Sequence, residues 1–164
     1  MPVVSPIRSH HPLSDGRQSD RALLVRRGVQ RLLGQHGAHA LPEIALPGGR
    51  RADLVAILPK GDLWIVEIKS SVEDFRADRK WPEYRLHCDR FFFATHLDVP
   101  ADIFPDEAGF ILSDGFGAEL LRDAPEHRLA PHHRRAMMLR LARAGAARLM
   151  AAELAGLKVP ALEE

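Results

Sequence analysis

The sequence has few of the residues that crosslink a protein or anchor it in a membrane. Only one of its 164 residues is a cysteine, Cys88, so the chain can form neither an internal disulfide nor a cysteine-rich zinc site. No apolar run approaches the roughly 20 residues that a membrane span requires, and no segment resembles a signal peptide. These absences favour a soluble protein, which we expect to be cytoplasmic and to have no membrane partner.

The composition is that of an ordinary globular protein, with 46% apolar and 27% charged residues. A chain of this length has room for one domain and needs no metal or disulfide to stabilise its core. We therefore expect a single domain over residues 19–157, a flexible proline-rich tail over residues 1–18 and a C-terminal tail over residues 158–164.

Positive and negative charges are separated along the chain, although the net charge is only +1. Residues 97–127 contain one basic residue, Arg122, and eight acids: Asp98, Asp102, Asp106, Glu107, Asp114, Glu119, Asp123 and Glu126. Residues 128–148 contain six arginines and no acid: Arg128, Arg134, Arg135, Arg140, Arg143 and Arg148. The basic segment either contacts nucleic acid or packs beside the acidic one, and the charges alone favour neither.

Hydrophobic periodicity predicts helices and strands in alternation. We expect a helix over residues 19–37, strands over 50–58 and 63–69, helical structure broken at Pro82 over 70–89, strands over 90–95 and 109–113, and a long helix over 131–156. Residues 39–46 alternate like a strand, and Pro42 in them indicates either an edge strand or the start of a strand. This order predicts an α/β fold with a mixed central sheet flanked by helices and with a long C-terminal helix.

The two strands over 50–58 and 63–69 contain the most informative residues. Both strands are apolar on both faces and are joined by a short turn, so they should be central strands of the sheet. Asp53, Glu67 and Lys69 interrupt these apolar runs. Burying three charges is costly unless they serve a function, so we interpret them as a candidate catalytic site.

Strand register decides whether these charges meet. Alternate residues of a strand share a face. If Ile57 pairs with Leu63, Asp53 lies directly opposite Glu67, whereas a slip of one residue would place Asp53 opposite Ile68 on the other face. We predict the first register, in which the two Cβ atoms are about 4.5–5.5 Å apart.

Two carboxylates and a backbone carbonyl are ligands suited to Mg²⁺ or Mn²⁺. Such an ion polarises a phosphoryl oxygen and can generate a nucleophilic hydroxide, and a lysine on the same face can stabilise the charge on the phosphate. The alternative is that Glu67 and Lys69 form a simple ion pair and that Asp53 caps a turn.

The chain also resembles a known family. The segments that carry the likeness are R-R-A-D-L-V-A-I-L, L-W-I-V-E-I-K-S-S, D-F-R-A-D-R-K-W-P-E-Y and C-D-R-F-F-F-A, within a region from about Val25 to Leu149. They are similar to MmcB, a bacterial DNA-repair-associated family placed in the PD-(D/E)XK nuclease superfamily.

The resemblance implies a restriction-endonuclease-like α-β-β-β-α-β core, related to Holliday-junction resolvases. It implies that Asp53, Glu67 and the backbone carbonyl of Ile68 bind Mg²⁺ or Mn²⁺ and that Lys69 assists catalysis. Many nucleases of this superfamily add a glutamate from the first helix. Residues 20–37 contain none, and Glu43 is the nearest substitute.

Basic residues around this motif are candidates for DNA contact: Arg50, Arg51, Arg76, Arg79, Lys80 and Arg85. The aromatic residues among them, such as Phe75 and Trp81, could stack on unpaired bases, but we favour a role in the core. On the last helix, Arg140 and Arg143 should lie opposite the apolar face, which gives that helix a basic outer surface.

Two functions fit these observations. The first is a divalent-metal-dependent DNA endonuclease or DNA-repair nuclease that hydrolyses phosphodiester bonds in structured or damaged DNA. The second is a catalytically silent module that binds DNA or recruits other DNA-repair proteins. Because junction resolvases cut two strands symmetrically as dimers, a homodimer is also expected.

Overall fold

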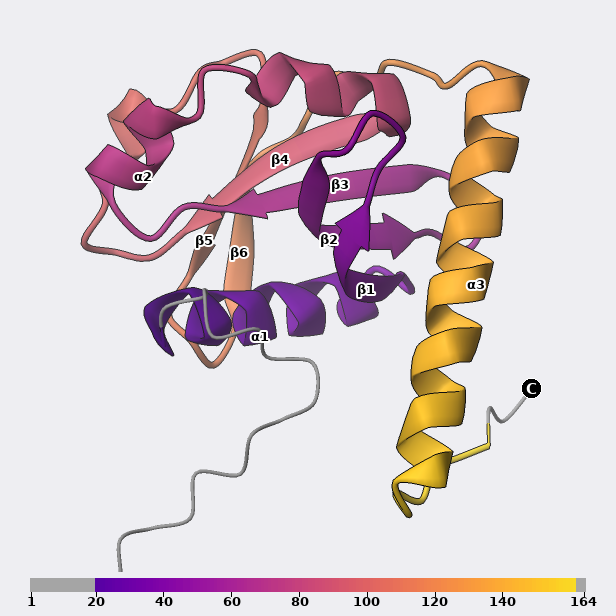
Figure 1. Ribbon diagram of the computed structural model, residues 1–164. Helices are drawn as coiled ribbons and strands as arrows, with labels where there is room; N and C mark the ends of the chain where they lie inside the picture. The colour runs from indigo at the N-terminus through magenta and orange to yellow at the C-terminus, as the bar shows by residue number, and fades with distance from the viewer. Residues whose placement is uncertain (1–19, 162–164) are drawn as a thin grey trace, which may run out of the picture.

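The computed structural model describes residues 20–161, so the predicted N-terminal tail and residues 162–164 of the predicted C-terminal tail lie outside the described residues. The elements are α1 (Asp20–Gln35), β1 (His39–Ala45), β2 (Arg51–Ile57), β3 (Leu63–Ile68), α2 (Val72–Ala77), the 3₁₀ helix η1 (Trp81–His87), β4 (Arg90–Thr95), the 3₁₀ helix η2 (Ala101–Ile103), β5 (Gly109–Ser113), β6 (Ala118–Arg122) and α3 (Pro131–Leu154). The predicted fold class is confirmed (Figure 1). Over the described range, no helix combines the length and the apolar character needed to cross a bilayer.

The six strands form one mixed sheet in the order β1-β2-β3-β4-β5-β6. Strands β1 to β3 pair antiparallel, β3 to β5 pair parallel, and β6 pairs antiparallel with β5. Strand β1 is an edge strand, one of the two possibilities that Pro42 indicated, and β2 and β3 are interior, as their apolar faces predicted. The parallel strands β3, β4 and β5 all end at the same edge of the sheet.

One element differs from the sequence prediction, and the broken helical region after β3 agrees with it. Strand β6 was not expected. It is only five residues long, its residues alternate between half-buried and exposed, and it follows a turn that looked like the end of the sheet. The helical region that follows β3 consists of one short α-helix and then a 3₁₀ helix. Pro82 lacks a backbone N–H, which fits the start of the second helix.

The sheet separates two hydrophobic cores. One core lies under α1 and contains Val29, Val66 and Phe92. The other contains Phe91 and Phe93, together with residues of η1 and α3. This division follows from strand geometry, since adjacent residues of β4 point to opposite faces.

The contact between α1 and the end of β5 leaves no space for a side chain at Gly28. A Cβ atom on Gly28 would lie 2.1 Å from the Ser113 hydroxyl oxygen and 2.5 Å from the Gly117 carbonyl oxygen. Glycine at this position therefore lets the helix approach the turn that joins β5 to β6.

Helix α3 is anchored near its start by Asp89, whose side chain is 1% exposed. The Asp89 carboxylate accepts the backbone N–H groups of Leu63 at 2.7 Å and Leu129 at 2.9 Å. It also accepts two bonds, of 2.8 and 2.6 Å, from the guanidinium of Arg134 in the first turn of α3. This single carboxylate joins the helix to the starts of β3 and β4.

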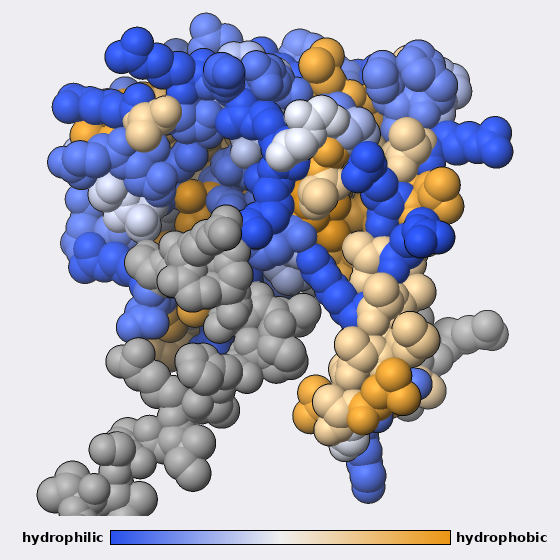
Figure 2. All heavy atoms as spheres, viewed as in Figure 1, coloured by the Kyte–Doolittle hydropathy of each residue, from blue (hydrophilic) through white to orange (hydrophobic). Residues whose placement is uncertain are grey.

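The far end of α3 extends beyond the sheet (Figures 1 and 2). Met137 and Leu141 are its only buried residues. Leu149, Met150 and Leu154 near its end are exposed, and Figure 2 shows this end as a largely apolar surface.

Candidate active site

The register of β2 and β3 is the predicted one. Leu54 pairs with Val66 and Ile57 pairs with Leu63. One step further along the same register brings Asp53 abreast of Glu67, on the face of the sheet that carries η1. The register prediction is therefore confirmed, and the two acids meet on neighbouring strands.

Each carboxylate is bound to the backbone of the other strand. The backbone N–H of Asp53 donates to Glu67 Oε1 at 2.9 Å, and the backbone N–H of Ile68 donates to Asp53 Oδ2 at 2.8 Å. Asp53 Oδ1 accepts no hydrogen bond from any described residue. The two acids are thus fixed side by side while this oxygen keeps its lone pairs for another ligand.

A third acid lies in the same row. In the β1–β2 register, Pro42 pairs with Leu54 and Ile44 pairs with Ala52, which brings Glu43 abreast of Asp53. The backbone of Glu43 has a φ of 54°, in the left-handed region, so β1 is irregular at this point. Its carboxylate binds Arg51 Nε at 2.6 Å. Glu43 therefore flanks the pair of acids, with its charge already balanced by an arginine.

Burial and mutual repulsion shift both central acids towards the protonated form. Burial raises the pKa of Asp53 to about 6, and the charge of Glu43 adds to this effect, while the Ile68 amide and Lys69 oppose it. Burial and the charge of Asp53 raise the pKa of Glu67 well above its ordinary value. Glu67 is only 4% exposed. A pair of carboxylates in this state gains from a cation that takes the place of a bound proton.

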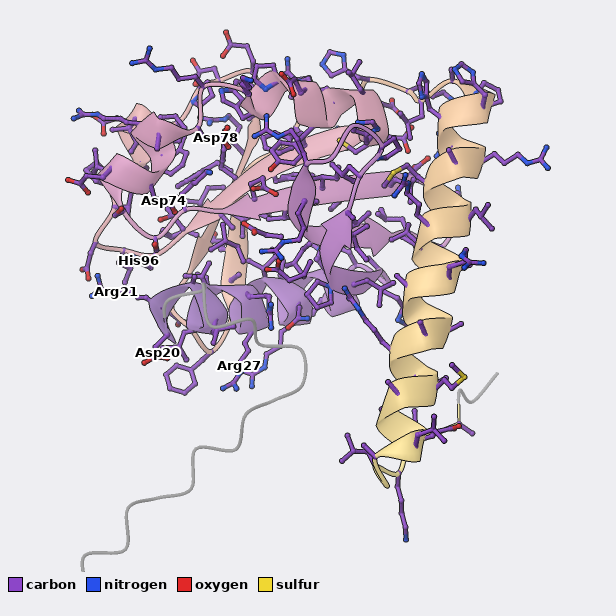
Figure 3. The ribbon with its side chains drawn as sticks, in the orientation of Figure 1. Asp20, Arg21, Arg27, Asp74, Asp78 and His96 are labelled. Carbon is purple, nitrogen blue, oxygen red and sulfur yellow. The ribbon has the colours of Figure 1, made fainter. Side chains whose placement is uncertain are left out.

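Lys69 follows Glu67 on the same face, and its amine lies 3.0 Å from the carboxylate of Asp78. Asp78 caps the C-terminal end of α2 (Figure 3). It also binds Arg50 at 3.1 Å. Burial alone would raise the pKa of Asp78, but the hydrogen bonds and charges of Lys69 and Arg50 lower it below its ordinary value. Asp78 therefore remains ionised and orients both cations.

Tyr84 of η1 completes this side of the site. Its ring stacks on Phe91, the guanidinium carbon of Arg50 lies 4.5 Å from the ring centroid, and its hydroxyl donates to the Arg51 carbonyl at 3.3 Å. Burial and the charge of Glu67 raise the pKa of Tyr84, so the hydroxyl stays protonated. Tyr84 thus covers Glu67 with a neutral hydrogen-bonding group.

The residues present fit a divalent cation with oxygen ligands. Asp53 and Glu67 supply neighbouring carboxylates, partly buried at Asp53 and buried at Glu67. The predicted third ligand, the Ile68 carbonyl, belongs to the residue directly after Glu67. Across residues 20–161, no three histidine, cysteine or acidic side chains form a ready-made cage. Water or substrate oxygens would therefore complete the coordination of an ion bound to the two acids, as is usual for Mg²⁺.

The basic residues expected to contact DNA fall into two groups. Arg50 and Arg51 lie beside the acids and pair with Asp78 and Glu43. The others lie further out on α2, η1 and the turn between them: Arg76, Arg79, Lys80 and Arg85.

In the second group, Arg76, Arg79 and Lys80 are exposed. The guanidinium carbon of Arg85 lies 4.9 Å from the ring centroid of Trp81, and Arg85 donates to the Glu107 carbonyl. Phe75 and Trp81 pack against the core, as favoured from the sequence. Contact of these basic residues with DNA stays a prediction.

Sequence analysis missed Asp78 and Tyr84 as parts of the site. Both lie within the D-F-R-A-D-R-K-W-P-E-Y segment that carries the family resemblance, which is the signal that pointed to this region. Arg140 and Arg143 are exposed, as the predicted basic outer face of the last helix requires, but they do not face away from the sheet. Both residues line a hollow between α3 and β1, because the helix lies along the edge strand.

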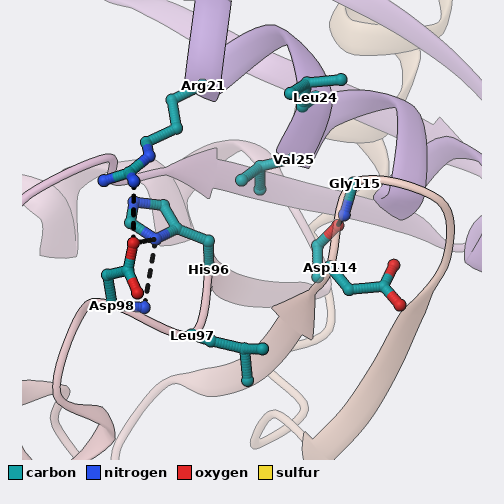
Figure 4. A pocket seen from close by; sticks show the side chains of 9 residues that line it. Arg21, Leu24, Val25, His96, Leu97, Asp98, Asp114 and Gly115 are labelled. Carbon is teal, nitrogen blue, oxygen red and sulfur yellow. Dashed lines mark hydrogen bonds and ion pairs between the residues drawn. The ribbon is translucent and has the colours of Figure 1, made fainter.

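A further hollow of about 240 Å³ lies on the α1 side of the sheet, between α1 and the loops after β4 and β5 (Figure 4). At its rim, the exposed side chains of Arg21 and Asp98 form an ion pair with a nitrogen–oxygen distance of 2.7 Å. His96 Nε2 lies 2.8 Å from the Ser70 carbonyl oxygen. This histidine therefore connects the loop after β4 to the loop after β3.

The chain is similar to a known protein family. A family model described as DNA repair protein MmcB-like matches residues 9–156. No curated protein matches the chain.

Among solved structures, the chain is similar to the SPO1766 protein of unknown function from Silicibacter pomeroyi. The two are 38% identical, with a TM-score of 0.79, and the match covers 83% of this chain and 93% of the other. The fold and the sequence likeness therefore extend over nearly the whole described domain.

Proposed function

The chain belongs to the MmcB-like family of DNA repair proteins, and from this membership and its acid cluster we propose that it is a divalent-metal-dependent DNA nuclease of the PD-(D/E)XK type. The observation that carries the proposal is the juxtaposition of Asp53 and Glu67 on adjacent strands, with Lys69 on the same face. Structured or damaged DNA is the substrate class that fits a repair protein.

Each residue has a distinct role in this proposal. Asp53, Glu67 and the Ile68 carbonyl hold Mg²⁺ or Mn²⁺, and Glu43 flanks the set. A bound ion of this kind polarises a phosphoryl oxygen and lowers the pKa of a water molecule. Lys69, oriented by Asp78, places a positive charge where negative charge develops on the phosphate.

The proposal is tested by incubating the purified protein with forked, junction and single-stranded DNA in Mg²⁺ or Mn²⁺. We expect cleavage that chelation abolishes and that Asp53→Asn and Lys69→Ala both lack. The matched control is Glu126→Gln, which removes an exposed acid far from the site in sequence. Equal cleavage by the wild type and by both site variants would identify a contaminant and contradict the proposal.

A second function is favoured by one specific observation. The Lys69 amine is held by Asp78, and each central carboxylate accepts a backbone amide, so each of these groups has a hydrogen-bond partner without metal. A fold with this arrangement can serve as a silent module that binds DNA or recruits repair proteins. DNA binding without metal-dependent cleavage would identify it. The predicted homodimer is tested by light scattering on the same sample.

A further inference from the structure

A hollow between α3 and β1 concentrates positive charge. Its volume is about 340 Å³, and it is lined by Glu43, Ile44, Ala45, Arg140, Arg143, Ala144 and Arg148. Three guanidinium groups thus face one carboxylate. In Figure 2, hydrophilic side chains reach across the space between the sheet and the middle of α3, below a group of apolar atoms.

The contacts of these arginines hold them in place without neutralising them. Arg140 donates to the Ala45 carbonyl at 3.1 Å, and Arg148 donates to the carbonyls of Pro42 and Glu43, the latter at 2.8 Å. Carbonyl oxygens accept these bonds but carry no net charge. Arg143 forms no hydrogen bond or ion pair within residues 20–161. The one acid of the hollow, Glu43, is already bound by Arg51.

The local electrostatics also favour an incoming anion. Burial lowers the pKa of Arg148, and repulsion from Arg26 lowers it further, while Glu43 partly opposes both effects. An anion in the hollow would relieve this repulsion and stabilise the charged guanidinium groups.

The hollow and the candidate active site have one residue in common. Glu43 lines the hollow and also lies abreast of Asp53 in the row of acids. Eight helical positions separate Arg140 from Arg148, which is about 12 Å along α3. A nucleic-acid strand that rises about 3.4 Å per phosphate could place several phosphates over that distance.

We propose that this hollow binds the phosphodiester backbone of the DNA strand that enters the candidate active site. The inference rests on the proposed function, because it assigns the hollow to the same substrate. It adds Arg140, Arg143 and Arg148 to the DNA-contacting residues and gives α3 a role beyond packing.

The test measures binding separately from cleavage. Fluorescein-labelled single-stranded and forked DNA is titrated with the full chain in EDTA, and anisotropy gives the Kd between 50 and 200 mM salt. The variants are Arg143→Gln and the double variant Arg140→Gln/Arg143→Gln. The matched control is Arg135→Gln, an exposed arginine of the same helix that does not line this hollow.

We expect each hollow arginine to contribute about three- to tenfold in affinity, and each loss to reduce the slope of log K against log salt by about 0.7–0.9. The Arg135→Gln variant should bind within about twofold of the wild type. Arg143→Lys, which keeps the charge, should recover most of the affinity. Thermal unfolding verifies that each variant is folded. If the double variant does not fold, the DNA affinity of Arg143→Gln alone tests the proposal.

Several results would overturn the inference. The first is an unchanged DNA affinity of Arg143→Gln, and the second is an equal loss of DNA affinity in Arg135→Gln. The third is binding of polyglutamate that depends on the hollow arginines while DNA does not bind, which would identify the hollow as a site for an acidic protein. Arginine-dependent DNA binding without cleavage in metal would support the hollow and contradict the nuclease proposal. If the double variant keeps both its DNA affinity and its cleavage activity, the result would support the nuclease proposal and contradict DNA binding in the hollow.

Discussion

The amine of Lys69, directly after β3, lies 3.0 Å from the carboxylate of Asp78 at the end of α2. Both side chains are nearly buried, with 8% and 10% of their surface exposed. Asp78 is also the partner of Arg50. One acid from a short connecting segment therefore neutralises two cations that flank the candidate active site.

Replacing Asp78 with asparagine should destabilise the protein. The change leaves Lys69 and Arg50 without a balancing charge in a largely buried position, and removing one partner of a buried pair costs about 3–5 kcal/mol. Urea denaturation measures the effect. The control, Glu73→Gln, removes an exposed acid of the same helix and should change stability by less than about 0.5 kcal/mol. Equal stability of Asp78→Asn and wild type would show that the pair contributes little.

Stability should depend on pH through Asp53. Its pKa of about 6 lies above the ordinary 3.8, so between these values the folded protein binds a proton that the unfolded chain does not. Without metal, stability should therefore rise as the pH falls from 7 through 6 towards 4, by up to about 3 kcal/mol.

The comparison that reports on Asp53 and its coupled neighbour Glu67 is with Asp53→Asn, measured by denaturation from pH 4 to 8, because the substitution also removes the charge that raises the pKa of Glu67. The variant should be more stable than the wild type at pH 7, and the difference should shrink on acidification. The lowered pKa values of Asp78 and Asp89 act in the opposite direction, but they are common to both proteins and cancel in the difference. A constant difference across this range would contradict the assignment.

Mg²⁺ or Mn²⁺ should stabilise the wild-type protein. A cation that binds the folded state at 100 times its Kd adds about 2.7 kcal/mol, and at the two acids it also removes their repulsion. Thermal unfolding with and without metal measures the shift. Asp53→Asn should lose it, while Glu126→Gln should keep it. A shift that persists in Asp53→Asn would place the ion elsewhere.

The hairpin and its register followed from the sequence because they depend on local features. The length of the turn and the apolar pattern of two neighbouring strands determine which residues pair, so the meeting of Asp53 and Glu67 could be predicted. The position of Asp78 could not. It depends on how α2 folds back over the sheet, and that is set by packing of Phe75 against Phe93 and Phe104, far apart along the chain.

Similar reasons explain the other differences. Strand β6 pairs with β5 through only a few residues and has no continuous apolar run, so its hydrophobic pattern was too weak to identify. The orientation of Arg140 depends on where α3 lies relative to β1. A helical wheel shows which side of a helix is apolar, but it does not show which strand lies beside the boundary.

Asp89→Asn should detach the start of α3 from the sheet. The carboxylate accepts two backbone amides and both ends of the Arg134 guanidinium, and asparagine can supply only one acceptor oxygen. We expect a loss of about 3–5 kcal/mol by urea denaturation. Asp123→Asn is the control, because Asp123 is 65% exposed in its pair with Arg90 and should contribute less than about 1 kcal/mol. Similar losses in the two variants would contradict the anchoring role.

Two glycines of α1 should respond in opposite ways to alanine. A Cβ atom on Gly28 would overlap the Ser113 hydroxyl and the Gly117 carbonyl, so the helix must shift and the protein should lose about 1–3 kcal/mol. At Gly34, no atom lies within 4 Å of the added Cβ. Alanine there should stabilise the protein by about 0.5–1 kcal/mol, because it restricts the unfolded chain and favours the helix. Thermal and urea unfolding of the two variants measure this difference within one helix. If both substitutions were neutral, α1 would have to lie further from the β5–β6 turn than the structure places it.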